Sequence, residues 1–175
     1  KATATIDWDW ASFQYLGSST NNKRGVNIAT GSSGLGTIDF CSFYDFVKSS
    51  SYGIQYSSTT NDGYITIKDS VFYNIAAFGF SNTSSTSTQL EISRCTFISP
   101  TSTGTAISLA DIGGSVTYVR IAGFSTAFSI TEVQGTINTI NNIVCHSFSS
   151  TGFIIGSLLG GTIDALTIYR GQTRS

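Results

Sequence analysis

The sequence predicts an all-β fold, a parallel β-helix (solenoid) of about six to seven coils with three short strands per coil. Its first support is a phenylalanine that recurs at steps of 30, 29, 25, 27 and 24 residues, at Phe13, Phe43, Phe72, Phe97, Phe124 and Phe148. Its second support is the alternation of apolar and polar residues between these positions, as in Val26-Asn27-Ile28. The third is composition, because 18 glycines, one proline and abundant Ser, Thr and Asn suit short strands joined by turns.

Each repeat supplies three strands, and alternation makes each strand apolar on one side and polar on the other. One strand carries the recurring phenylalanine, with a small residue two positions earlier at Ala11, Cys41, Ser70, Cys95 and Ala122. The next carries an apolar pair at Val26 and Ile28, Ile54 and Tyr56, Ile107 and Leu109, Phe128 and Ile130, and Phe153 and Ile155. The third carries a pair at Ile38 and Phe40, Ile65 and Ile67, Leu90 and Ile92, and Ile137 and Ile140. We expect coils stacked about 4.8 Å apart, with equivalent residues aligned in columns along the core.

The same alternation predicts which aromatic rings face the core. Trp8, Trp10 and Tyr56 share the parity of neighbouring isoleucines, so we expect their rings to point inward. Tyr44 and Tyr73 each follow a recurring phenylalanine and should point outward at equivalent positions one coil apart. Exposed rings stack well on sugars, so this pair is a candidate binding platform.

Two stretches carry a family likeness, Ile65-Thr66-Ile67-Lys68-Asp69-Ser70-Val71-Phe72-Tyr73-Asn74-Ile75 and Leu90-Glu91-Ile92-Ser93-Arg94-Cys95-Thr96-Phe97. Their column pattern resembles the right-handed parallel β-helix of the pectate-lyase-like superfamily over nearly the whole chain. The segments from Ile65 to Phe80 and from Ser115 to Ile130 are similar to the β-helix repeats of large surface proteins with G8 domains, the fibrocystin and cell-surface hyaluronidase group. The resemblance implies a right-handed solenoid. The compact Asp-rich, Gly-His-Gly and Arg-x-Lys motifs of the superfamily's lyases and polygalacturonases are absent from the sequence, which argues against catalysis.

Composition narrows the partners. A net charge of −1 with 11% charged residues leaves no basic stripe for a nucleic-acid backbone. No run of 18 apolar residues occurs, so we expect no membrane insertion. We expect a single domain over residues 1–175. Because strands lie next to both termini without polar caps, we expect an uncapped segment of a longer chain, or a filament subunit that meets copies of itself end to end.

The three cysteines are expected to be buried, free thiols. Cys41 and Cys95 fall in one column two coils apart, about 9.6 Å between Cα atoms, beyond the roughly 7 Å that a disulfide can bridge. An intermolecular bridge through one of them or through Cys145 is the alternative. The sequon Asn82-Thr83-Ser84 lies in a Ser/Thr-rich run that we expect to be an exposed turn, so Asn82 is a candidate glycosylation site.

Two charged groups are candidate sites. If the strand of Asp7 and Asp9 stacks with Asp39 beside Asp7, the two carboxylates could share a calcium ion or divide acid and nucleophile roles; counting from the phenylalanines places Thr37 beside Asp7 instead. A second group, Lys68, Arg94 and Arg120, recurs at steps of 26 residues and could form a basic ladder for an anionic sugar, with Asp69 and Glu91 close enough to neutralise it. His146 lies between Cys145 and Ser147, but neighbours on a strand point to opposite sides, so we expect no catalytic triad.

Together these observations predict a structural or adhesive extracellular or cell-surface element, a rigid rod without catalytic residues, cofactor or metal. Its expected partners are copies of itself or flanking segments of the same chain, and glycans. The alternative is a carbohydrate-binding or carbohydrate-active β-helix, a lyase or hydrolase, using the acidic group or the basic ladder.

Overall fold

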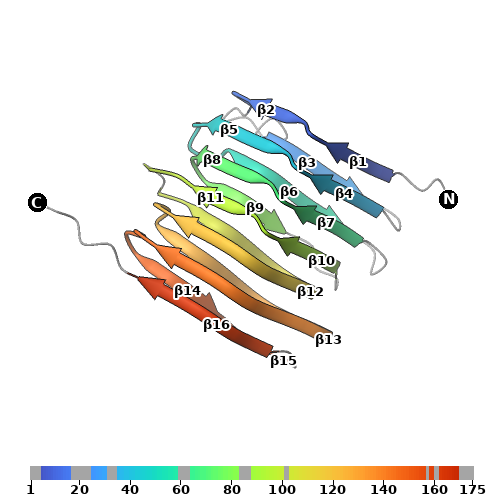
Figure 1. The fold of residues 1–175 in the computed structure, drawn as a ribbon, viewed down its shortest axis with the longest axis vertical. Coiled ribbons are helices and arrows are strands. Elements are labelled where there is room, and N and C mark those ends of the chain that lie inside the picture. The colour runs from blue at the N-terminus through green and yellow to red at the C-terminus, as the bar shows by residue number, and fades with distance from the viewer. Residues whose placement is uncertain are drawn as a thin grey trace, which may run out of the picture.

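The computed structural model describes residues 5–16, 25–30, 35–58, 64–82, 88–100, 103–156, 158–159 and 162–169. Within these ranges the chain is all-β, and every strand pair is parallel, as expected for a β-solenoid. Figure 1 shows the strands stacked in layers along the long axis, with the N-terminal strands at one end and the C-terminal strands at the other.

The strands are β1 (Thr5–Asp9), β2 (Ser12–Gln14), β3 (Gly25–Thr30), β4 (Leu35–Asp39), β5 (Ser42–Phe46), β6 (Tyr52–Ser58), β7 (Tyr64–Lys68), β8 (Val71–Ile75), β9 (Phe78–Asn82), β10 (Thr88–Ser93), β11 (Thr96–Ile98), β12 (Thr105–Ala122), β13 (Thr126–His146), β14 (Thr151–Ile155), β15 (Leu158–Leu159) and β16 (Thr162–Tyr169). They form three faces. The first face stacks β1, β4, β7 and β10 on segments of β12, β13 and β16. The second stacks β2, β5, β8 and β11 on later segments of the same long strands, and the third stacks β3, β6 and β9 on the beginnings of β12 and β13, followed by β14.

Register aligns the inward side chains in columns, which is why the alternating sequence folds as stacked coils. The first-face column consists of Trp8, Ile38, Ile67, Ile92, Val116, Ile140 and Ile163. The third-face column consists of Val26, Ile54, Phe80, Ile107, Phe128 and Phe153. Their middle members are fully buried in one hydrophobic core. Removal of this apolar surface from water is the main stabilisation of the coils.

The recurring phenylalanines divide into two columns, which corrects the single column predicted. Phe13, Phe43, Phe72 and Phe97 stack on the second face with ring centroids 4.9, 4.7 and 4.4 Å apart. The column then continues through Ile121 and Cys145. Phe124 and Phe148 lie three residues beyond these positions, at the turn that leaves the second face. Likewise Val119, rather than Ala122, continues the small-residue column, because Ala122 pairs with the outward His146.

A left-handed residue forms the corner between the first and second faces in each coil. The residues with positive φ there are Trp10, Phe40, Asp69, Arg94, Tyr118, Asn142 and Ala165. This conformation is uncommon outside glycine, and here it turns the chain at the same point of every coil. The small residue that follows completes the corner with its own side chain: Sγ of Cys41 donates to the Asp39 carbonyl at 3.2 Å, and Oγ of Ser70 to the Lys68 carbonyl at 2.7 Å.

This corner overturns the inward orientation predicted for Trp10 and the inward pair predicted for Phe40. Trp8 packs against the core as expected. A left-handed residue interrupts the alternation, however, so the rings of Trp10 and Phe40 leave the core and are 74% and 43% exposed. They stack on each other with centroids 4.5 Å apart. Tyr56, on the third face, is buried as predicted.

The structure has about four turns, fewer than the six to seven coils predicted from length and period. The turns that begin at β4, β7, β10 and the middle of β12 have fully buried cores. In the outer layers, inward residues such as Phe13, Phe153 and Ile163 are only partly buried, because a neighbouring layer covers them on one side alone. Division by the repeat length cannot distinguish closed turns from these open ones.

Candidate binding surfaces

The acidic group has the second of the two registers considered above. Asp7 pairs with Thr37, and Asp39 pairs with Asp9 on one side and Lys68 on the other. Asp7 and Asp39 are therefore not register partners, which removes the predicted carboxylate pair. Within the described ranges no group of three or more His, Cys, Asp and Glu side chains could hold a metal ion.

The basic ladder does not form, although its predicted neutralisation does. Lys68 is in the first-face strand β7, Arg94 at the corner, and Arg120 in the second-face segment of β12, so the regular spacing does not place them in one column. Nζ of Lys68 lies 3.1 Å from Glu91, and Arg94 binds Asp69 through two hydrogen bonds of 2.8 and 2.6 Å. Hydrogen bonding from Arg94 lowers the pKa of the Asp69 carboxyl.

The thiols are free and buried, as predicted. Desolvation raises the pKa of Cys41, and raises those of Cys95 and Cys145 to about 12. Cys95 donates to the Ser93 carbonyl at 3.3 Å, in the same corner arrangement as Cys41 and Ser70. Cys145 instead occupies the second-face column that holds phenylalanine in earlier coils. Burial and raised pKa values make these thiols structural rather than nucleophilic.

Three further predicted sites are placed as follows. Tyr44 and Tyr73 are register partners on the outside of the second face, and the Tyr73 ring is exposed, as predicted. His146 lies outward, with Nδ1 3.2 Å from the Ser147 hydroxyl and Nε2 accepting from Arg120 at 3.4 Å, whereas Cys145 is buried. Asn82 is 2% exposed, on the core side of β9 between Tyr56 and Leu109. Its burial contradicts the exposed turn predicted for it; Thr83 and Ser84 lie outside the described residues.

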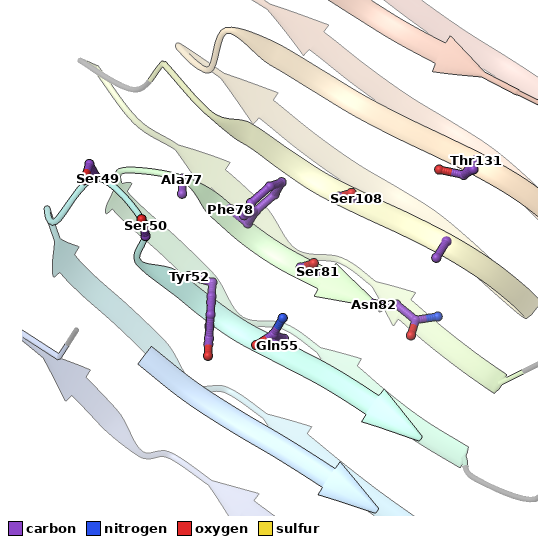
Figure 2. A pocket seen from close by; sticks show the side chains of 11 residues that line it. Ser49, Ser50, Tyr52, Gln55, Ala77, Phe78, Ser81, Asn82, Ser108 and Thr131 are labelled. Atoms are coloured by element: carbon purple, nitrogen blue, oxygen red, sulfur yellow. The ribbon is translucent and has the colours of Figure 1, made fainter. Parts of the chain in front are cut away.

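The third face carries a hollow of about 500 Å³ that the sequence interpretation missed. Its lining residues are Ser49, Ser50, Tyr52, Gln55, Ala77, Phe78, Ser81, Asn82, Ser108, Ala110 and Thr131. Figure 2 shows Gln55, Ser81 and Ser108 on neighbouring strands, with Phe78 toward the strand beginnings and Asn82 toward the strand ends. The signal was available in the sequence, because these three polar residues occupy the outward position between apolar neighbours in successive coils.

No protein-family model, curated protein or solved structure matches this chain significantly. The described residues include no helix long and apolar enough to cross a membrane. The arguments for function therefore rest on the geometry of the coils and of their outer surfaces.

Proposed function

We propose that this chain is a structural or adhesive element of an extracellular surface or filament, a rigid rod without a catalytic site of its own. The observation that carries the proposal is the parallel pairing of successive strands on all three faces, from β1, β2 and β3 at one edge to β14 and β16 at the other. Each coil is thereby hydrogen-bonded to the next around its circumference, an arrangement that resists bending.

The two end layers favour axial contact with further coils. At the N-terminal edge Ile6, Trp8 and Phe13 are partly buried, and Trp10 stacks on Phe40 yet keeps most of its surface exposed. At the other edge Ile168 and Tyr169 are exposed. A further parallel coil at either edge would bury apolar surface and pair the outer strands. We propose copies of the chain, or flanking segments of the same polypeptide, as the source of these coils.

Negative-stain electron microscopy of the chain over a series of concentrations tests the proposal. We expect rods of constant width whose length grows with concentration. Trp10→Glu should shorten them, because it places a charge on the outer layer. Tyr118→Glu is the matched control, since Tyr118 occupies the same corner column in the interior of the rod and is also exposed. Particles of one constant length, equally unaffected by both variants, would refute end-to-end assembly.

A further inference from the structure

We infer that the hollow on the third face binds a neutral oligosaccharide. This goes beyond the rod proposed above, because it concerns the side of the solenoid rather than its ends. The hollow has the volume of a small-ligand site, for which about 300–1,000 Å³ is typical. It arises because Gln55, Ser81 and Ser108 form a column of short or slender side chains, while the Phe78 ring stands beside them at the beginning of β9.

The chemistry of the lining selects an uncharged, hydroxyl-rich ligand. None of the eleven lining residues is charged, so neither an acidic nor a basic ligand gains an ion pair. Serine, threonine, glutamine and asparagine side chains both donate and accept hydrogen bonds, as sugar hydroxyls do. Phe78 is half-buried and turned into the hollow, where its ring can cover the apolar face of a sugar.

The strand pairing favours a sugar over a peptide. Extended peptides commonly bind by adding a strand to a free sheet edge. Here β6 already pairs with β3 and β9, and β9 pairs with β6 and β12. The hollow therefore lies over the middle of a sheet, and its ligand must be held by side chains. Ala110 and Thr131 extend the lining into the next coils, so the site runs across successive strands along the rod axis.

Calorimetric titration with neutral hexasaccharides of glucose, mannose and galactose, and with a galacturonate hexamer as charged comparison, tests this site. We expect at least one neutral hexasaccharide to bind more tightly than the galacturonate. Ser108→Glu should weaken that binding by at least about tenfold, because it puts a bulky charge on the floor. Ser129→Glu is the matched control, since Ser129 is the register partner of Ser108 one coil away and does not line the hollow. It should change affinity less than about twofold.

Two results would overturn the site. One is the absence of binding to all three neutral sugars at about 10 mM, or tighter binding of the galacturonate. The other is an equal loss in Ser108→Glu and Ser129→Glu. Circular dichroism establishes that each variant folds. If Ser108→Glu does not fold, Gln55→Ala and its register partner outside the hollow, Asn27→Ala, make the same comparison, with loss expected only in Gln55→Ala.

Discussion

Two parts of the solenoid solve the same packing problem with different residues. In the aromatic half, defined by β2, β5, β8 and β11, the second-face column is a stack of phenylalanine rings. In the aliphatic half, where this face is formed by β12, β13 and β16, the column is Ile121, Cys145 and Ile168.

The third face compensates for this difference. Glycines oppose the rings of the aromatic half: a Cβ on Gly53 would lie 2.7 Å from the Phe72 ring, and one on Gly79 2.5 Å from the Phe97 ring. The equivalent third-face positions in β12 and β13 are Ala106 and Ala127, both fully buried. The coil therefore keeps its volume constant, and a larger inward residue on one face requires a smaller one on the next.

The largest expected effect comes from breaking the ring stack. Phe72→Ala removes a fully buried ring that packs between Phe43 and Phe97, and we expect a loss of about 3–5 kcal/mol in unfolding free energy. Cys145→Ala, in the same column of the aliphatic half, removes a single sulfur and should cost about 1 kcal/mol. Urea unfolding followed by circular dichroism measures both. Equal losses would show that the two halves do not differ in packing.

Exchanging the two solutions sharpens the comparison. Gly79→Ala should cost about 1–3 kcal/mol, because the new Cβ would meet the Phe97 ring and the Ala106 carbonyl oxygen at 2.6 Å. Combining it with Phe97→Ile recreates the Ala106 and Ile121 combination of the aliphatic half. We expect the double variant to lose less stability than the sum of the single losses, with a coupling of about 1 kcal/mol. Simple additivity in the double-mutant cycle would contradict volume compensation.

The same contrast explains what could be predicted from the sequence. Alternation and repeat length identified the parallel solenoid and the buried positions of Phe43, Phe72 and Phe97, because hydrophobic burial depends on local parity. The column beyond Phe97 was misassigned because the coils shorten: Phe97, Ile121 and Cys145 follow one another at 24 residues, so a phenylalanine at step 27 lies beyond the face. Phenylalanine alone is thus an incomplete marker of register where isoleucine or cysteine fills the same volume.

The candidate sites were harder to predict, because sites depend on which columns adjoin. Arg94 and Lys68 fall on different parts of the coil despite regular spacing, since one left-handed residue per corner shifts the parity. The same corner turned Trp10 outward. No local sequence pattern marks such a corner before the fold is known, whereas the small donor residue after it, as at Cys41 and Ser70, is recognisable afterwards.

The two buried cysteines test the corner against the column. Cys95→Ser should cost less than about 1 kcal/mol, because Ser70 already places a hydroxyl at the equivalent corner position, where it binds a carbonyl. Cys145→Ser should cost about 1–3 kcal/mol, because its site is desolvated and surrounded by apolar residues. Thermal melts of both variants measure the difference. A larger loss in Cys95→Ser would refute the proposed role of the corner hydrogen bond.

A smaller effect is expected on the third face, where one inward column holds Tyr56 and Asn82 in the aromatic half but Leu109 and Ile130 in the aliphatic half. The Tyr56 hydroxyl is buried and has no hydrogen-bond partner within the described part of the chain. Tyr56→Phe should therefore raise unfolding free energy by up to about 1 kcal/mol, since no buried hydroxyl need be desolvated. Destabilisation in urea unfolding would mean that the hydroxyl has a partner in solution.

The smallest effect concerns the first corner, which holds the Asp69–Arg94 ion pair in the aromatic half and Tyr118 and Asn142 in the aliphatic half. Because Arg94 lowers the pKa of Asp69, the pair stabilises the fold above the ordinary carboxyl pKa, and this stabilisation is lost as pH falls through the lowered value. Both side chains reach solvent, so Arg94→Gln should lower the melting temperature by about one degree or less near pH 7.

That difference between Arg94→Gln and the unchanged chain should vanish near pH 2, where the Asp69 carboxyl is protonated in either protein. Tyr118→Gln, at the same corner but without an ion pair in the described contacts, should show a pH-independent difference. A gap for Arg94→Gln that persists in acid would assign the effect to packing of the arginine stem rather than to charge. The corner column would then stabilise both halves through the same apolar contacts, and the contrast between them would be confined to the core.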